Sequence, residues 1–508
     1  MLLLLTVHLL VALAAPLLVS WLGRRAFLVL ALAPASAAVW ALTQTQAVLD
    51  GDGPVEVVTW VPALSLELAF RLDTLGWLMT LLVGGVGALV LVYCAAYFSA
   101  SASGLGRFGG VLVAFAGAML GLVTTDDLLL LYVFWELTTV FSYLLIGHYS
   151  DRKSSRRAAM QAIIVTTAGG LAMFVAFVLL GEATGSYRVS DVVADPPGGP
   201  LATTAVVLLL LGALSKSALV PLHFWLPAAM AAPTPVSAYL HAAAMVKAGV
   251  YLVARFAPGY AELGVWRGVV AAAGTWTLVH GGYRALRQHD LKLVLAFGTV
   301  SQLGLLVLLV GLPGQATALA GLAMLGAHAM FKAALFLVVG IVDAATGTRD
   351  LRRLTGVGRA LPVTAAVGAL ATLSMIGIWP FAGFVAKEAA LEGLLHDAAT
   401  PTGVLVVVGM VLGSALTVAY GLRFWWGAFA DRTITATDDD GAPYPPPRVT
   451  PSSWLLVAPA AVLAAGGLVL GLLPALGERL LQPNAATYTG EAGHLVLWAG
   501  PTPAFRLT

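Results

Sequence analysis

Four of the chain's six lysines lie inside hydrophobic segments long enough to cross a lipid bilayer, namely Lys216, Lys247, Lys332 and Lys387. A charged side chain near the centre of a bilayer costs about 3 kcal/mol on insertion scales, so such residues are rare and mark ion pathways. A lysine ammonium also carries a proton that it can release. The row of lysines therefore predicts proton movement through a membrane domain.

The composition requires a helical membrane protein. Hydrophobic residues make up 59% of the 508 residues and charged residues only 10%, which lies outside the range of soluble globular domains. Because a membrane-spanning helix needs about 20 mostly apolar residues, we predict an all-α polytopic membrane protein with about fourteen transmembrane helices. The predicted segments are residues 2–20, 26–43, 73–98, 109–125, 127–148, 158–181, 202–226, 236–256, 264–282, 290–311, 316–342, 363–387, 402–422 and 453–473.

The basic residues predict the orientation. Most of those outside the segments follow odd-numbered helices, and only Arg71, Arg188, Arg255 and Arg267 fall in the other loops. Since cytoplasmic loops are enriched in Lys and Arg, we expect a bacterial inner-membrane protein with the first set of loops in the cytoplasm and both ends of the helical core outside. The first segment has no basic flank ahead of its apolar run and is predicted to be a retained helix.

Little of the chain is expected outside the membrane. Residues 54–72 show the alternating pattern of β-strands, with β-branched and aromatic residues around Pro62, and predict an external β-hairpin. Residues 437–448 predict a proline-rich cytoplasmic linker. The single Cys94 allows neither an internal disulfide nor a cysteine metal cluster. No nucleotide or haem motif is present, so we expect no cofactor and no enzyme activity of its own. The net charge of +2 indicates no nucleic-acid partner.

The fifth and seventh segments hold the first candidate site. Glu136 is the one carboxylate well inside a segment and should be protonated or paired there, although a neutral glutamate that only hydrogen-bonds between helices is an alternative. Pro221 removes a backbone donor and should break the seventh helix in mid-membrane, just after Lys216. Broken helices place ion sites in transporters, and a simple packing kink is the alternative. His223 beside the break is a further candidate.

The eighth and eleventh segments hold the second candidate site. Lys247 is a pathway candidate, whereas His241, six residues earlier and on another face of a regular helix, is equally consistent with a core histidine. His328 and Lys332 are spaced i, i+4 and share a helix face. This spacing suits a relay in which a neutral imidazole accepts the proton that the ammonium releases. The alternative is that His328 only packs in the core.

The twelfth segment repeats the pattern of the seventh. Pro380 should break it, and Lys387 follows the break. The neighbouring Glu388 either pairs with Lys387 or marks the external boundary of the helix. Two proline-broken helices five helices apart indicate a five-helix repeat, which must be inverted because its number of helices is odd.

These features predict four regions. Residues 1–108 form three helices with the hairpin, residues 109–260 the first repeat, residues 261–430 the inverted second repeat, and residues 431–508 the linker, a last helix and the C-terminal segment. Glu136 and Lys216 would form one half-channel and Lys387 the other. Lys247, His328 and Lys332 would link them.

Several motifs make the chain similar to a known family. The motifs are FWELTTVFSYLLIGH, KSALVPLHFWLPAAMAAPTPVSAYLHAAAMVKAG, DLKLVLAFGTVSQLG and GAHAMFKAALFLVVG. They resemble the antiporter-like membrane subunits shared by respiratory complex I and the Mrp-type multisubunit sodium/proton antiporters, over nearly all of residues 60–475. Leu137 and Lys247 fit the large A-type subunits of Mrp antiporters better than the L-type subunits of complex I.

The resemblance implies a proton path and a multisubunit assembly. The residues that match the family's proton path are Glu136, Lys216, Lys247, His328, Lys332 and Lys387, and Lys292 matches a recurring family lysine near the cytoplasmic end of its helix. The implied partners are other hydrophobic subunits of a Mrp-type complex, with protons and sodium as the transported ions. Family members of the A type normally continue well beyond this point, so we expect a truncated or split subunit, and no sodium site is assigned.

Three functions follow as hypotheses. The first is a proton-translocating subunit of a cation/proton antiporter, in which Lys216 keeps its charge beside Glu136 and gives up its proton when the two separate. The second is a proton-pumping subunit of a complex I-like or hydrogenase-like redox complex. The third is a structural membrane subunit that transports nothing, which four intramembrane lysines argue against.

Overall fold

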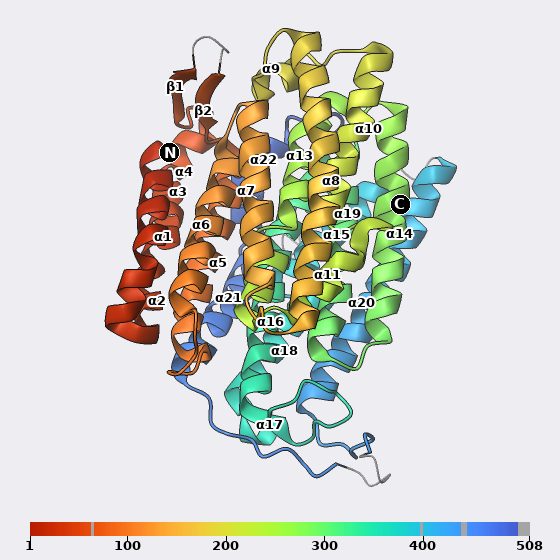
Figure 1. Cartoon of the computed structure of the whole chain (residues 1–508). Coiled ribbons are helices and arrows are strands. Elements are labelled where there is room, and N and C mark those ends of the chain that lie inside the picture. Colours follow the sequence, from red (N-terminus) through yellow and green to blue (C-terminus); the bar gives the residue numbers. More distant parts are fainter. Residues whose placement is uncertain (62–65, 397–399, 438–443, 496–508) are drawn as a thin grey trace.

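The computed structural model describes residues 1–61, 66–396, 400–437 and 444–495, which form a bundle of long helices lying side by side (Figure 1). Ten helical stretches of the described residues are long and apolar enough to cross a membrane. The first of them, Leu2–Thr43, turns back at Gly23–Arg25 and covers two predicted segments. The chain is therefore a multi-pass helical membrane protein, as predicted.

The N-terminal helices and the hairpin lie together. Helix α1 (Leu2–Leu22) leads away from the hairpin end, and α2 (Ala26–Leu30), α3 (Leu32–Thr43) and α4 (Thr45–Leu49) return to it (Figure 1). Strands β1 (Val55–Val61) and β2 (Leu66–Arg71) pair antiparallel, with Val57 opposite Ala69. This confirms the predicted hairpin, although Pro62 lies outside the described residues. Helix α5 (Thr74–Tyr97) starts directly after β2.

The first broken helix lies in the next part of the chain. Helices α6 (Leu105–Thr124), α7 (Leu128–Ile146), α8 (Lys153–Thr184), α9 (Val189–Ala194) and α10 (Gly199–Lys216) follow in order. Helix α10 ends at Lys216, and the chain resumes as short turns, with α11 at Trp225–Ala228 and α12 at Thr234–Val236. The predicted break before Pro221 is confirmed.

The prediction of one continuous eighth helix, residues 236–256, is wrong in its first part. Its first part is a π-helical turn, Ser237–His241, and residues 242–246 are not helical, so regular helix starts only at Lys247 in α13 (Lys247–Tyr260). His241 and Lys247 therefore do not belong to one regular helix, and the predicted difference in helix face does not apply to them. Residues 242–246 read AAAMV and hold no proline or glycine, so tertiary contacts rather than local propensity produce this break.

The second half of the chain contains the other broken helix. It comprises α14 (Gly264–Leu286), α15 (Leu291–Gly311), α16 (Gln315–Thr346), α17 (Val357–Ala360), α18 (Pro362–Ile376), α19 (Ala382–His396), α20 (Pro401–Phe429), α21 (Trp454–Leu472) and α22 (Pro474–Ala485). The gap between α18 and α19 contains Pro380 and confirms the predicted break. Helix α19 runs nine residues beyond Lys387, whereas the sequence predicted an end at Lys387.

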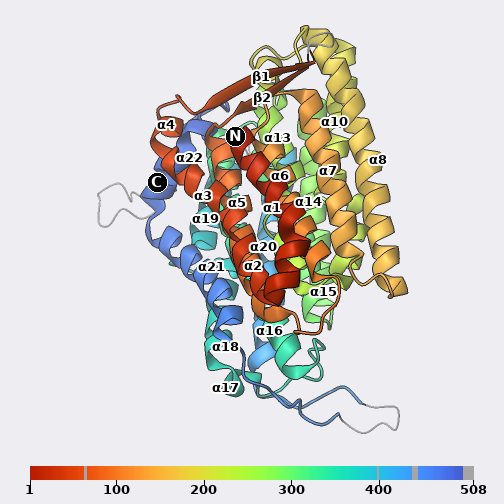
Figure 2. The same ribbon diagram turned by 60° about the vertical axis from the view of Figure 1, so that its left-hand side comes forward.

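The two ends of the bundle differ. The hairpin and α9 lie at one end, whereas α17 and the chain between α20 and α21 lie at the other (Figure 1). That chain includes the predicted linker 437–448, of which residues 438–443 lie outside the described part. In the rotated view, α8 and α10 stand at one edge of the bundle and α21 at the opposite edge (Figure 2). The division into two inverted repeats stays a prediction.

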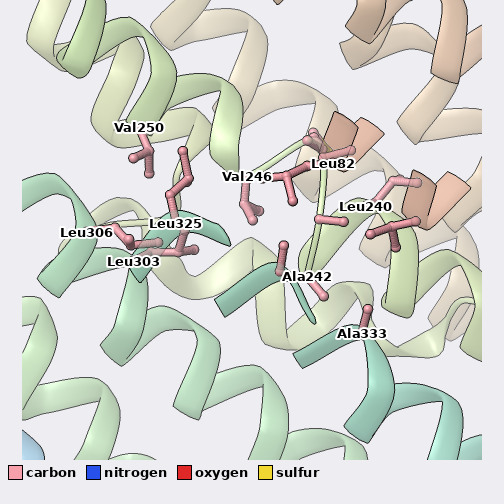
Figure 3. Packing of buried hydrophobic residues seen from close by; sticks show 14 of the residues in the cluster. Leu82, Leu240, Ala242, Val246, Val250, Leu303, Leu306, Leu325 and Ala333 are labelled. Atoms are coloured by element: carbon pink, nitrogen blue, oxygen red, sulfur yellow. The ribbon is translucent and has the colours of Figure 1, made fainter. Parts of the chain in front are cut away.

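The broken segment before α13 lies within the apolar core. Leu240, Ala242 and Val246 pack between Leu82 of α5 and the helices α15 and α16, which contribute Leu303, Leu306, Leu325 and Ala333 (Figure 3). All residues from Val236 to Val250 are buried. A break in such surroundings must satisfy its free backbone groups inside the protein, because neither water nor lipid reaches them.

An ion pair fixes the hairpin end of α5 to α13. Asp73 precedes α5, and its carboxylate accepts a hydrogen bond from the N–H of Gly76, 2.9 Å away. The guanidinium of Arg255 in α13 donates to both oxygens of the same carboxylate. Asp73 thus caps one helix and holds another, and both side chains are largely buried.

We expect Asp73→Ala to lower the stability of the protein by about 2 kcal/mol, because it removes a helix cap and leaves the buried charge of Arg255 unpaired. The control is Arg352→Ala, which breaks the exposed pair between Arg352 and Asp350 at the other end of the bundle. Hydrogen bonds from Arg352 hold the pKa of Asp350 below its ordinary value, but exposed pairs contribute little to stability. Thermal unfolding of both variants in detergent measures the difference, and equal shifts would contradict this role of Asp73.

Candidate functional site

Glu136 and Lys216 lie close to the same residue but do not form an ion pair in this structure. Lys216, the last residue of α10, is fully buried, and its ammonium donates to the carbonyl of Trp135 at 2.9 Å and to the hydroxyl of Thr139 at 2.7 Å. Glu136 belongs to α7, and the hydroxyl of Thr167 in α8 donates to its Oε2 at 3.4 Å. In this structure the ammonium of Lys216 therefore hydrogen-bonds to neutral oxygens only, among the described residues.

The carbonyl of Trp135 is one of the two acceptors for Lys216. It also accepts from the hydroxyls of Thr138 at 2.7 Å and Thr139 at 3.2 Å. The ammonium of Lys216 lies 4.8 Å from the centre of the Trp135 ring, an arrangement that stabilises a cation. Sequence reasoning missed Trp135, Thr139 and Thr167. Thr139 lies about one turn after Glu136 on α7, and Thr167 lies on the neighbouring helix α8.

Lys247 and His328 meet although they are 81 residues apart. Lys247 opens α13 after the non-helical residues 242–246, and His328 lies in the middle of α16; both are fully buried. The Nζ of Lys247 lies 3.0 Å from the Nδ1 of His328 and also donates to the carbonyl of Ala242 in the break. The break before α13 thus supplies an acceptor for the lysine that follows it.

Lys332 lies one turn beyond His328 on α16, as the spacing predicted. Its ammonium lies 3.4 Å from the carbonyl of Leu295 in α15 and 5.5 Å from the centre of the Tyr420 ring in α20. The Nε2 of His328 is buried and has no hydrogen-bond partner among the described residues. His328 therefore contacts Lys247 through one ring nitrogen and has its other nitrogen free.

Lys387 lies in α19 just after the second break. It is 8% exposed, and its ammonium donates to the carbonyls of Met375 at 2.9 Å and Ile376 at 3.2 Å. These carbonyls end α18, where the helix dipole favours a positive charge. Glu388 is exposed, and no ion pair joins it to Lys387 in the described part of the chain.

The remaining candidates lie beside this row. Lys292, the second residue of α15, is buried and donates to the carbonyls of Ala232 at 2.8 Å and Met230 at 3.2 Å. His241 is fully buried, and neither ring nitrogen has a partner among the described residues. His223 lies in the turn after the first break, with its ring 5.1 Å from that of His280. None of these three hydrogen-bonds to Lys247 in the described part of the chain.

No metal site stands out in the described residues. No three His, Cys, Asp or Glu side chains among them gather closely enough to hold a metal ion. What the structure brings together is a set of buried ammonium and imidazole groups whose partners are carbonyls, hydroxyls and one another. Such groups exchange protons and are not ligands for a hard cation, which prefers several oxygen atoms.

Comparisons with known proteins place the chain in a family. Residues 125–415 match the family model described as NADH:quinone oxidoreductase/Mrp antiporter, TM, and residues 59–109 match the N-terminal model of complex I chain 5. The A/B component of a probable K⁺/H⁺ antiporter from Rhizobium meliloti is 42% identical over 82% of this chain and 41% of its own length. The A1 component of a Na⁺/H⁺ antiporter from Staphylococcus haemolyticus is 36% identical over 90% of this chain and 59% of its own length.

Solved structures show the same fold. The Mrp complex from Dietzia sp. contains a chain that aligns with a TM-score of 0.87 and 38% identity, over 99% of this chain and 53% of the other. Respiratory complex I from Thermus thermophilus aligns with a TM-score of 0.81 at 23% identity, over 96% of this chain, which supports the fold alone. The chain spans between 41% and 59% of the length of the Rhizobium and Staphylococcus relatives.

The matched model covers the broken helices, Glu136 and every buried lysine of the row, and it extends over more than half of the chain. The chain therefore belongs to the NADH:quinone oxidoreductase/Mrp antiporter family of membrane proteins.

Proposed function

We propose that this chain is the proton-translocating part of an A-type subunit in a multisubunit cation/proton antiporter of the Mrp type. The observation that carries the proposal is the contact between Lys247 and His328, which joins two protonatable groups from different helices inside the apolar core. The relatives at 36% and 42% identity bear antiporter names, for sodium in one case and potassium in the other. Other hydrophobic subunits would complete the transporter, with the Arg-rich end of the bundle in the cytoplasm.

The central step is a proton transfer through His328. The ammonium of Lys247 donates a proton to Nδ1 of the imidazole, which becomes an imidazolium, and the proton on Nε2 then passes to a neutral amine, for which Lys332, one turn along α16, is the candidate. The ring thereby returns to neutrality as the other tautomer, and it must exchange its proton or rotate before the next cycle. Charge on each lysine favours or opposes charge on its neighbour, which couples successive steps.

Glu136 lies on α7 and would exchange a proton at the Lys216 end of the row of buried lysines. We expect Glu136→Gln to lower cation-dependent proton flux in membrane vesicles at least tenfold, because the amide cannot exchange a proton while its shape is preserved. The control is Glu388→Gln, since that exposed carboxylate contacts none of the buried lysines and should leave flux unchanged. Wild-type flux in the Glu136 variant at equal expression would rule out its role.

Lys216 must release its proton rather than serve as a fixed charge. Lys216→Arg is therefore expected to be strongly impaired, because a guanidinium stays protonated and cannot release its proton. Lys153→Arg, at the exposed start of α8, is the matched control. Proton flux after an imposed pH jump measures both, and a fully active Lys216 variant would show that charge alone suffices.

Lys247 and His328 should act as one unit. Since removing either interrupts the same contact, the double variant Lys247→Ala/His328→Ala should lose little more flux than the worse single variant. The pair Lys247→Ala/Lys387→Ala, whose side chains are held by different breaks, serves for comparison. Flux losses that multiply independently for Lys247 and His328 would mean that the histidine only packs in the core.

A further inference from the structure

A groove between helices lies on one side of the bundle. It runs between α5, α16 and α21, is bounded at the hairpin end by α22, and has a volume of about 590 Å³. Figure 2 shows α5, α21 and α22 on the same side of the bundle. Three of the lining side chains, Leu42, Val462 and Leu470, are exposed, so the groove opens to the outer surface of the helices.

Two glycines leave this space unfilled. Gly85 of α5 and Gly326 of α16 line the groove, and a Cβ atom added at either position would meet no heavy atom within 4 Å. No side chain of the described residues therefore occupies the space in front of them. Glycine is unfavourable inside a helix, and neither position has the left-handed backbone or the close helix contact that would require it.

The lining offers nothing that would hold water. Apart from Thr45 and Trp77, each described residue that lines the groove has an apolar side chain or is a glycine. The indole N–H of Trp77 donates to the carbonyl of Ala41 at 2.9 Å and to the hydroxyl of Thr45 at 3.2 Å, and that hydroxyl donates to the carbonyl of Leu42 at 2.8 Å. Because a buried water needs about two to four polar partners, the groove is suited to hydrocarbon instead.

The groove has the depth of one membrane leaflet. Its lining residues on α5 extend from Trp77 to Leu89, which is about 18 Å at about 1.5 Å per residue. The hydrocarbon core of a bilayer is about 30 Å thick, so one leaflet contributes about 15 Å. On α16 the lining ends at Met330, near the middle of that helix. A helix that crosses the membrane would extend well beyond this inner end, whereas an acyl chain of one leaflet would not.

From this geometry we infer that the groove binds one acyl chain of a phospholipid from the leaflet at the hairpin end. Hydrocarbon fits the apolar lining, and the depth of the groove fits a chain of that leaflet. The head group lies beside α22, where the exposed Arg479 is available to pair with its phosphate. Trp77 at the same end suits the boundary between hydrocarbon and head groups.

The acyl chain supports the helices that carry the buried lysines. Gly326 lines the groove two residues before His328 in α16. Ala382 and Val385 line it at the start of α19, just before Lys387. Hydrocarbon in the groove supplies dispersion contacts that these turns lack when it is empty. The inference goes beyond the proposed function and does not depend on it.

A photoactivatable phospholipid tests the site. The probe is a diacyl phosphatidylglycerol whose acyl chain carries a diazirine, added to vesicles of phosphatidylethanolamine and phosphatidylglycerol that contain the whole complex. The complex is then solubilised, washed repeatedly with detergent and illuminated. Residues 77–89 of α5 and 322–330 of α16 should retain at least fivefold more label than the exposed face of α8, because washing removes the lipid that merely surrounds the protein.

Gly326→Leu is the decisive variant. Its side chain should fill the groove without a clash, since a Cβ atom at this position meets nothing, and should reduce the retained label of α5 at least fivefold. Gly85→Leu fills the groove from α5 and should reduce the label of α16 in the same way. Gly268→Leu is the matched control: it adds the same side chain at an open position on α14, outside this groove, and should leave the label unchanged.

Thermal unfolding gives a second measurement. Adding phosphatidylglycerol to the washed wild type and to Gly268→Leu should raise the melting temperature by several degrees, because a ligand that binds only the folded state stabilises it. Gly326→Leu and Gly85→Leu should no longer respond, since their side chains already fill the groove.

Three results would overturn the inference. They are retained label that is equal in α5 and α8, retained label in both groove variants that equals that of the wild type, and an isoprenoid quinone or a helix of another subunit identified in the groove by mass spectrometry. None of them bears on the proton path, which Glu136→Gln tests separately.

Discussion

The structure depends on one constraint: an ammonium group in an apolar interior needs oxygen atoms that are not already used. A regular helix offers few, because its carbonyls are already bonded within the helix, although those of Trp135 in α7 and Leu295 in α15 also accept from Lys216 and Lys332. At Lys247 and Lys387 the chain supplies such oxygens by interrupting a helix. Lys247 uses the carbonyl of Ala242 in one break, and Lys387 uses those of Met375 and Ile376 at another. For Lys247 and Lys387, the interrupted helix supplies the acceptors that the buried ammonium group needs.

The core around the breaks must be rigid for this to work. Residues 242–246 are enclosed by α5, α15 and α16 (Figure 3), and side chains from other elements bond their surroundings: the hydroxyl of Ser217 donates to the carbonyl of Val246 at 2.7 Å, and that of Tyr239 to the carbonyl of Val83 at 2.9 Å. A close-packed interior holds such geometry to a fraction of an ångström. The contact between Lys247 and His328 is therefore fixed from three helices rather than by two long side chains alone.

Much of this fold could be predicted from sequence, because apolar length and proline have direct physical meanings. The hairpin, the helical segments and the breaks near Pro221 and Pro380 follow from them. The break before Lys247 could not be predicted, because residues 242–246 favour a helix and only tertiary contacts interrupt it. The contact of Lys247 with His328 and the use of the Trp135 carbonyl by Lys216 each join residues 81 positions apart. Spacing rules describe neighbours on one helix, so they indicated His328 with Lys332 but not these partners.

If the row of buried lysines carries protons as proposed, repulsion between its positive groups would limit how many it holds at once. Two like charges ~8 Å apart repel by about 2 kcal/mol at an effective dielectric constant of ~20. Lys247 and Lys332 flank a single imidazole, so charging either one opposes charge on His328 and on the other. In the proposed function, a proton that arrives at one end would therefore favour the departure of another further along. The membrane potential, worth about 2.3 kcal/mol per charge per 100 mV, is comparable to this repulsion, so it suffices to bias the direction in which such displacements run.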